Sequence, residues 1–362
     1  MHIIIAVTND LVTDRRVAKI AETLYNTGHS ITLVGRILPQ SSSINRNYKT
    51  KRFKLMFNKG ALFYANYNIR LFFYLLFRKF DIILSNDLDT LLASYLTTKI
   101  RNKKIIYDSH EYFTEVPELI NRKFQQNTWK FIERLILPKL KYTYTVSQSI
   151  ADEYNKKYGT NFKVIRNLPE KSKPVNVEKQ NVIIYQGALN IGRGIELMIK
   201  TMQYLPDYKL WIAGTGDIDD KLKKLTADLN LNEKVMFFGR IDPEKLYNYT
   251  YAAKLGLSFE EDLGKNYRFA LPNKLFDYIQ ARIPALVSDL PEMKRIVAEY
   301  KTGEILKSRK PEDIALQVSN MLNNKSKYNS FVENCNIAAN LLCWENEKTK
   351  LELIINELTK NN

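Results

Sequence analysis

The amino-acid sequence predicts an α/β fold in which each half of the chain forms a parallel β-sheet covered by helices on both faces. Short apolar runs typical of buried strands alternate with helical patterns along nearly the whole chain. Such alternation favours a parallel sheet over an antiparallel one. A polar segment with two prolines, residues 169–180, is typical of a linker between domains. We therefore expect two domains, residues 1–168 and 181–344.

Each half is expected to contain six strands. In the first half the strand-like runs are residues 2–7, 30–35, 80–86, 104–110, 142–147 and 162–166, and in the second half they are 181–187, 208–214, 234–239, 253–259, 283–288 and 303–306. Two similar halves of this kind fit a pair of Rossmann-like domains. Because such sheets bind ligands at the carboxyl ends of their strands, the residues that follow each strand are the first candidates for a site. We expect the ligand in the cleft between the domains.

Composition and charge restrict the class of protein. The 362 residues are enough for two domains with substantial cores, and 45% hydrophobic content is typical of a globular chain. The net charge of +16, from 55 Lys and Arg against 39 Asp and Glu, favours anionic partners such as phosphorylated ligands, an anionic membrane face or nucleic acid. No nucleic-acid-binding motif accompanies this charge, so we expect no nucleic acid partner.

The two cysteines, Cys335 and Cys343, fit no metal spacing and predict a reducing compartment without disulfides. No cleavable signal precedes the first strand pattern, so we expect a protein of the cytoplasm, or one bound peripherally at the inner face of the plasma membrane. We expect neither a metal ion nor a bound cofactor.

Two aromatic and basic segments lie in the first half, Phe63–Phe80 and Asn121–Lys141. The first segment is too short and too charged at its edges to span a bilayer, which needs about 20 apolar residues. The first segment favours a core helix, with a partly exposed face that touches membrane as the alternative. The second is either an amphipathic surface helix or a contact with anionic lipid, and the pattern favours neither.

Charged side chains follow the first and third strands of this half. Asp14 and Arg16 precede a helix, where the structural alternative is a helix N-cap with a solvated arginine. Asn86 and Asp87 follow the third strand, and Asp87 begins an Asp-x-Asp pair with Asp89. Such a pair can bind a divalent metal. Acidic residues are nevertheless expected at the start of a helix, and we favour that interpretation.

Among the three histidines, His110 is the only one at the end of a predicted strand, so it lies at the expected mouth of the site. A functional role is favoured over a structural one for that reason.

The second half offers two places suited to an anion. A glycine-bounded loop, residues 187–194, leads into a helix and carries Arg193, whose guanidinium can bind two phosphate oxygens. Lys274 lies in the first turn of a later helix. A cation is unfavourable at that end of a helix, so its placement predicts a nearby anion.

Several segments, in order along the chain, resemble glycosyltransferases of family 4, which have the GT-B fold. Residues 271–279 and 283–289 resemble the donor-site segment of that family, and Tyr107-Asp-Ser-His-Glu resembles its D-x-H-E loop. Residues 187–194 resemble its phosphate-binding loop, and Trp344-Glu resembles the step before a final helix that returns to the first domain, here 345–362. The resemblance covers nearly the whole chain.

The resemblance implies roles for individual residues. It places around a nucleotide-sugar donor the residues Gly187, Arg193, Gly194, Arg240, Ile241, Asn266, Asn273, Lys274 and Asp277. It places on the acceptor side Asp14, Arg16, Asn86, Asp87, Glu111 and Glu115. The catalytic candidates are His110, which approaches the donor sugar, and Arg193 and Lys274, which hold the diphosphate.

The sequence departs from the family pattern in places. Asp277 stands where the family usually has Glu, Ala188 where many members have a basic residue, and Arg282 where they have Gly. The first Glu of the family's Glu-x7-Glu pair is replaced by Phe269. The group that holds the sugar hydroxyls therefore stays open among three residues. They are Glu260, Glu261 and Asn266.

The expected function is transfer of a hexose from a nucleotide sugar, with a UDP-sugar favoured, to a glycan or lipid-linked glycan in surface polysaccharide biosynthesis. The resemblance implies retention at the anomeric carbon without a metal. Two alternatives stay open: a nucleotide-sugar epimerase or hydrolase with the same donor site, and a basic membrane-binding protein without catalysis.

Overall fold

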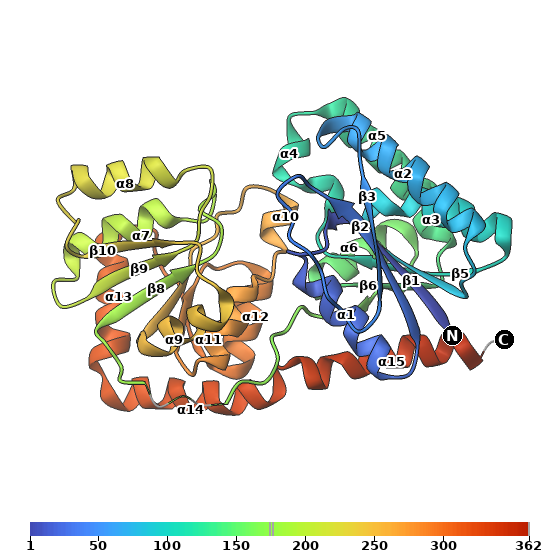
Figure 1. Cartoon of the computed structure of the whole chain (residues 1–362). Helices are drawn as coiled ribbons and strands as arrows, with labels where there is room; N and C mark the ends of the chain where they lie inside the picture. The colour runs from blue at the N-terminus through green and yellow to red at the C-terminus, as the bar shows by residue number, and fades with distance from the viewer. Residues whose placement is uncertain (174, 176, 361–362) are drawn as a thin grey trace. The chain divides into compact units, whose positions relative to one another are not determined.

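The computed structural model describes residues 1–173, 175 and 177–360, and the chain forms two compact units (Figure 1). Unit 1 consists of Met1–Asn167 together with the segment from Glu347 onward, and unit 2 consists of Leu168–Asn346. Each unit contains one sheet in which every strand pairing is parallel. The predicted α/β class with two Rossmann-like domains is confirmed.

The sheet of unit 1 has the strand order β3-β2-β1-β4-β5-β6-β7. Its strands are β1 His2–Asp10, β2 Ser30–Ile37, β3 Lys49–Lys54, β4 Ile82–Asn86, β5 Lys104–Ser109, β6 Tyr142–Thr145 and β7 Lys163–Val164. The order reverses between β1 and β4, and ligands of doubly wound sheets bind at the carboxyl ends of the strands at such a reversal. The segments that follow β1, β4 and β5 are therefore the ones placed to form a site.

The first half was predicted to have six strands, and this prediction is wrong because it omitted β3. This strand pairs with β2 at the edge of the sheet, from Thr32 opposite Lys49 to Ile37 opposite Lys54. Its sequence, KTKRFK, buries only Phe53. An edge strand has one neighbour and a largely exposed surface, so it needs no apolar run, and the search for apolar runs could not find it.

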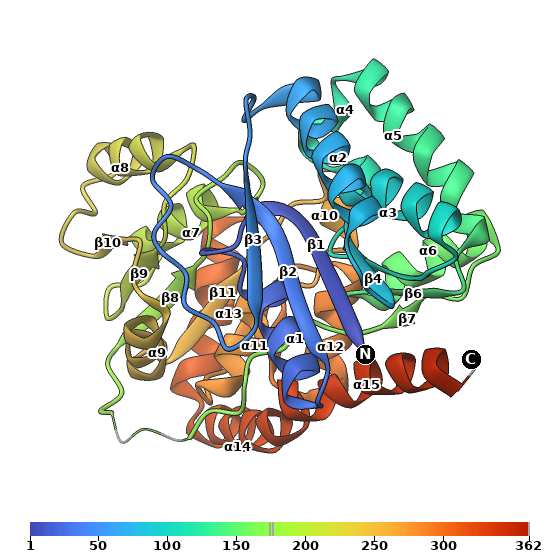
Figure 2. The ribbon, with the colours of Figure 1, turned by 45° about the vertical axis from the view of Figure 1, so that its right-hand side comes forward.

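Helices cover both faces of this sheet (Figures 1 and 2). They are α1 Arg15–Asn26, α2 Gly60–Phe77, α3 Leu88–Arg101, α4 Pro117–Ile120, α5 Lys123–Ile136, α6 Gln148–Tyr158 and α15 Trp344–Lys360. Helices α2 and α3 pack through Tyr67, Leu71 and Ala93 onto the face that carries Ile4 and Ile83. Helix α3 also packs against α5. In both views α1 and α15 lie on the other side of the sheet from α2, α3 and α5.

The sheet of unit 2 has the order β10-β9-β8-β11-β12-β13, which reverses between β8 and β11 in the same way. Its strands are β8 Val182–Gln186, β9 Lys209–Ala213, β10 Val235–Gly239, β11 Leu255–Ser258, β12 Ala285–Val287 and β13 Gly303–Ile305. Its helices are α7 Ile195–Thr201, α8 Asp219–Asp228, α9 Pro243–Ala252, α10 Lys265–Arg268, α11 Asn273–Gln280, α12 Pro291–Tyr300, α13 Pro311–Asn323 and α14 Lys325–Leu341. The six strands predicted for this half are all present.

Successive residues of β8 point into two separate cores. Ile183 and Tyr185 join the cluster formed with α7, α8 and α13, and Val182 and Ile184 join the cluster formed with α9, α11 and α12. Because both faces are covered, all five residues of β8 are buried. The central strand is thus held rigidly, and so is the loop that begins at its carboxyl end.

Within the described part of the chain, none of the helices is both long enough and apolar enough to cross a membrane. Cys335 and Cys343 are both free and buried.

Candidate functional site

In unit 1 the carboxyl ends of β4 and β5, the residues that follow them and the start of α1 bring together a buried network of charges. Arg16 donates from Nη2 to Asp108 Oδ1 at 2.9 Å, and the two side chains are 7% and 0% exposed. His110 directs Nε2 to Asp108 Oδ2 at 3.1 Å and Nδ1 to Asp87 Oδ2 at 3.2 Å. Its backbone N–H also donates to Asp87 Oδ1 at 2.8 Å. Asn86 Oδ1 lies 3.2 Å from the same Nε2 that faces Asp108.

The network sets the protonation of the histidine. Burial alone would lower the pKa of His110, but the carboxylates of Asp87 and Asp108 outweigh burial and raise the pKa to about 9. The pKa of Asp108 lies below its usual value, because the charges of Arg16 and His110 overcome the effect of burial. Burial raises the pKa of Asp87. With a carboxylate facing each ring nitrogen, His110 is an imidazolium at neutral pH, and it is a donor rather than a proton acceptor.

The residues predicted for the start of the first helix have different surroundings. Asp14 is the N-cap of α1, and its Oδ1 accepts from the backbone N–H of Val17 at 3.0 Å. Asp14 is therefore a helix N-cap, and its acceptor-side role stays a prediction. The structural alternative is wrong for Arg16, which is buried against Asp108 and not solvated. Arg16 points inward because it lies on the side of α1 that also carries the buried residues Val17 and Ile20.

The acidic residues after β5 lie toward the surface. Glu111 is exposed, whereas Glu115 forms an ion pair with Lys130 of α5 at 2.9 Å. This ion pair connects the loop after β5 to α5, so the carboxylate of Glu115 has a structural role.

The Asp-x-Asp pair after β4 is divided between two partners. Asp87 faces His110, whereas Asp89 is buried and accepts from Thr8 Oγ1 at 2.5 Å. Burial, and then the charge of Asp87, raises the pKa of Asp89 to about 8. In the described part of the chain no group of three or more His, Cys, Asp and Glu side chains is arranged to hold a metal ion. Metal-independent chemistry remains a prediction.

In unit 2 Lys274 is paired with a carboxylate of the same chain, and the anionic ligand expected beside it stays a prediction. Lys274 Nζ lies 2.7 Å from Glu260 Oε1, with the two side chains 8% and 0% exposed. The ammonium also lies 4.2 Å from the centre of the Tyr185 ring. Glu260 accepts a second hydrogen bond from Ser258 Oγ at 2.7 Å. Burial would raise the pKa of Glu260, but Lys274 and Ser258 together hold the pKa below its usual value.

Arg193 completes this cluster from the loop after β8. Its Nη1 lies 3.7 Å from Glu260 Oε1, its guanidinium lies 5.1 Å from the centre of the Tyr267 ring, and it keeps 29% exposure. Gly194 allows the approach: with φ at 69°, a Cβ there would lie 2.3 Å from the backbone oxygen of Phe259. A Cβ on Gly187 would lie 3.7 Å from Lys274 Nζ, so this backbone borders the ammonium. Two cations and one carboxylate therefore meet at the ends of β8 and β11.

Asp277 lies one turn beyond Lys274 on α11 and is half-buried. Its Oδ2 accepts from Gln186 Nε2 at 2.8 Å, and Gln186 accepts from Thr250 at 2.7 Å. The last residue of β8 thus orients the carboxylate. Asn273 is exposed at the first position of the same helix.

The other predicted donor-side residues lie at the edges of unit 2. Arg240 is exposed and Ile241 is half-buried after β10, and the half-buried Asn266 lies in α10.

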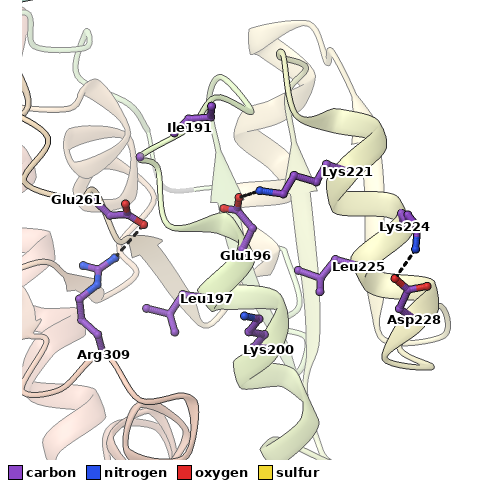
Figure 3. A pocket seen from close by; sticks show the side chains of 11 residues that line it. Ile191, Glu196, Leu197, Lys200, Lys221, Lys224, Leu225, Asp228, Glu261 and Arg309 are labelled. Atoms are coloured by element: carbon purple, nitrogen blue, oxygen red, sulfur yellow. Dashed lines mark hydrogen bonds and ion pairs between the residues drawn. The ribbon is translucent and has the colours of Figure 1, made fainter. Parts of the chain in front are cut away.

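A cavity of about 600 Å³ lies between α7 and α8 (Figure 3). Glu196 faces Lys221 at 3.1 Å, Asp228 faces Lys224 at 2.8 Å, and Arg309 lies 3.7 Å from a carboxylate oxygen of Glu261. The lining includes Glu261, one of the three candidates for the sugar hydroxyls, but neither Arg193 nor Lys274. Its carboxylates are neutralised by pairing, and we assign it no part in the site.

Sequence reasoning missed three residues that shape these clusters. Asp108 belongs to the D-x-H-E segment, and its position near the end of β5 is a usable signal in the sequence. Tyr185 lies inside a buried strand, and nothing in its sequence context distinguishes it from a core residue. Tyr267 lies in the short helix α10, and its position beside Arg193 depends on the fold.

Comparison with known proteins identifies the family. The family model for glycosyl transferases group 1 matches residues 168–336, and the model for Glycosyltransferase Family 4 matches residues 13–168. The chain belongs to the family 4 type of GT-B glycosyltransferases. The two matched segments meet at residue 168, where unit 2 begins.

Solved structures share the fold of this glycosyltransferase along its full length. Sucrose-phosphate synthase from Thermosynechococcus elongatus superposes with a TM-score of 0.82 at 16% identity, covering 100% of both chains. HepE of Anabaena, solved with UDP and glucose, has a TM-score of 0.76 at 13% identity over 99% of this chain and 100% of its own. An uncharacterized glycosyltransferase of Methanocaldococcus jannaschii is 26% identical over 151 residues, which are 40% of this chain and 36% of that relative.

Proposed function

We propose that this glycosyltransferase moves a hexose from a nucleoside-diphosphate sugar, with a UDP-sugar favoured, to a glycan or lipid-linked glycan. The observation that carries the proposal is the cluster of Lys274, Arg193 and Glu260 at the carboxyl ends of β8 and β11. This is the position at which doubly wound sheets bind phosphorylated ligands. The related fold of HepE is known in complex with UDP and glucose.

In this proposal the donor is held by residues of unit 2. Arg193, which keeps partial exposure, binds the diphosphate oxygens, and the buried Lys274 supplies a second positive charge. The carboxylate of Glu260 fixes both cations in position before the donor arrives. Asp277, oriented by Gln186, accepts from the ribose hydroxyls.

As the glycosidic bond to the diphosphate breaks, negative charge accumulates on the leaving oxygen, and the fixed cations stabilise it. Such stabilisation needs no metal ion. We propose that the reaction proceeds with retention at the anomeric carbon, assisted by the leaving phosphate. His110, as an imidazolium, donates to an oxygen of the sugar and does not act as a base.

We place the reaction in surface polysaccharide biosynthesis, with the protein in the cytoplasm as a peripheral partner of an anionic membrane. The charge of +16 and the two basic aromatic segments support this setting. Partners are then a nucleotide sugar and a glycan or lipid-linked acceptor, without nucleic acid.

The first test is thermal-shift binding of UDP, GDP, ADP and CDP, each with and without Mg²⁺. We expect stabilisation by UDP that does not depend on the metal and is lost in Arg193→Ala. Lys200→Ala is the matched control, because Lys200 is an exposed cation on α7 of the same unit that touches no member of the cluster. Failure of every nucleotide to stabilise the wild-type protein would contradict the donor site.

Turnover of the UDP-sugar tests the chemical role. Arg193→Ala should lower turnover by roughly two to three powers of ten while the fold persists, because it removes one donor to the developing charge. Near-normal turnover of this variant would refute the assignment. Product analysis without an acceptor separates the alternatives: an epimerized sugar or fast release of free sugar would favour an epimerase or a hydrolase.

A further inference from the structure

The outer surface of helices α2, α3 and α5 in unit 1 carries an unusual set of side chains. Among the described residues five phenylalanines are exposed, and all five lie between residues 57 and 131. On α2 the exposed apolar residues are Leu62, Ile69, Phe73 and Phe77, on α3 they are Leu96 and Ile100, and on α5 they are Phe124, Phe131 and Leu135. We call this set the α2–α3–α5 surface.

The spacing shows that each helix has one outward apolar stripe. Ile69, Phe73 and Phe77 are four residues apart, so they lie on one side of α2. The opposite side of α2 carries Tyr67 and Leu71, which are fully buried in the core. A helix that is apolar all round is normally buried all round. Here half of it faces outward, with Phe73 54% and Phe77 78% exposed.

The three helices lie side by side (Figures 1 and 2). Helix α3 packs against both α2 and α5, and the rings of Tyr64 on α2 and Trp129 on α5 meet edge to face at 5.1 Å. The three outward stripes therefore belong to one layer on one side of the sheet of unit 1.

The charge on this surface has a single sign. Helices α2, α3 and α5 contain only two acidic residues, Asp89 and Glu133, and these are 8% and 0% exposed. The basic residues of the three helices are Arg70, Lys99, Arg101, Lys123, Lys130 and Arg134. Lys130 pairs with Glu115 of the neighbouring loop, and Arg101 donates to backbone oxygens. The remaining four are exposed cations beside the apolar stripes.

We infer that the α2–α3–α5 surface binds the face of an anionic lipid bilayer, with the phenylalanines inserted at the level of the headgroups. Apolar side chains flanked by Lys and Arg are the composition of interfacial helices, and each basic residue near an anionic membrane adds attraction. The four exposed cations, with no exposed carboxylate among the described residues of the three helices, complement an anionic surface. This inference assigns the surface used in the membrane contact proposed above, and it rests on that part of the proposal.

The experiment is co-flotation of the full chain with phosphatidylcholine vesicles that contain or lack phosphatidylglycerol, at low and at high salt. We expect binding only with phosphatidylglycerol, and weaker binding at high salt. Phe73→Ser/Phe77→Ser should lower the partition coefficient at least tenfold, which corresponds to about 1.4 kcal/mol. The control is Leu316→Ser/Ile337→Ser, two apolar residues of unit 2 with 64% and 54% exposure. It should bind like the wild type.

A second variant tests whether a loss of vesicle binding could come from misfolding. Lys99→Glu/Lys123→Glu leaves every buried residue in place and should lower binding to the anionic vesicles by a similar factor. Equal flotation of the wild type and both surface variants, or no flotation of the wild type, would overturn the inference. So would a wild-type dimer that Phe73→Ser/Phe77→Ser converts to a monomer, since a second copy would then cover the surface.

The result is separable from that of the donor site. Phe73→Ser/Phe77→Ser should keep the stabilisation by UDP, because the changed residues lie in unit 1 and the donor-side residues in unit 2. Vesicle binding without any nucleotide response would support this surface while refuting the proposed donor, and the reverse pattern would refute the surface alone.

Discussion

Replacing Lys274 by methionine removes one charge from a buried ion pair and leaves the carboxylate of Glu260 in the interior of unit 2. Glu260 is fully buried, and its Oε1 lies 2.7 Å from the lysine Nζ. Breaking a buried pair by removing one partner costs about 3–5 kcal/mol, because the remaining charge lacks solvent. Arg193, 3.7 Å from the same oxygen, offers partial compensation. We therefore expect a loss at the lower end, about 3 kcal/mol.

The loss translates into a shift of the melting temperature. Unit 2 spans residues 168–346, and for domains of about 150–250 residues 1 kcal/mol corresponds to roughly 2–4 °C. Lys274→Met should thus lower the melting temperature of unit 2 by roughly 6–12 °C. Scanning calorimetry is the assay, because it separates the transitions when two units unfold independently.

A double-mutant cycle tests the cause. Glu260→Gln in the Lys274→Met background removes the stranded carboxylate, so the double variant should regain about 2 kcal/mol of the loss. The two single variants each lower the melting temperature, and the sum of these two decreases is the value expected without coupling. If the double variant loses at least that sum, Lys274 and Glu260 are not coupled and the reasoning is wrong. A shift below about 2 °C for Lys274→Met would refute it as well.

Other predictions concern the remaining charges of the two units. Of the three histidines, His110 should titrate near pH 9 in NMR spectra. Its pKa should fall in Asp108→Asn. A pKa near the ordinary 6.5 in the wild type would contradict the pairing of His110 with two carboxylates. Since the folded pKa is raised, the stabilisation from His110 is fully present below pH 6.5 and is lost as the pH rises through about 9, and His110→Gln should abolish this loss in melting curves. The stabilisation from Glu260, whose pKa is lowered, is present above pH 4.5 and is lost on further acidification, so Glu260→Gln should flatten the acid limb. Asp14→Ala should cost about 1 kcal/mol in unfolding free energy, because it removes the N-cap of α1, and Asp14→Asn should restore most of it.

The elements that sequence reasoning found are those with a buried apolar run. Strand β8, with every residue buried, is visible in any search for such runs, and the same holds for β12. Strand β3 escaped because its burial pattern needs only Phe53. The reason is physical: a strand that buries almost no side chains needs no run of apolar residues, so its sequence does not mark it as a strand.

The sequence predicted which loops contribute to the site. It did not predict which side chains contact one another. The position of Lys274 in the first turn of α11 suggested an anion nearby, but the sequence could not show that Lys274 pairs with Glu260, fourteen residues earlier. Residues on different loops meet only after the sheet aligns the ends of β8 and β11. Arg16 illustrates the same limit, since its partner Asp108 lies 92 residues away.

The basic edge strand β3 has a consequence for how the protein behaves when it is concentrated. The outer side of an edge strand leaves backbone N–H and C=O groups available, and another molecule can add a strand there and begin an intermolecular sheet. Lys49, Lys51 and Lys54 are exposed on this strand, and two approaching copies would bring these like charges together. Repulsion between these lysines opposes such pairing, so the residues that leave β3 without an apolar run also disfavour the addition of a strand at this edge.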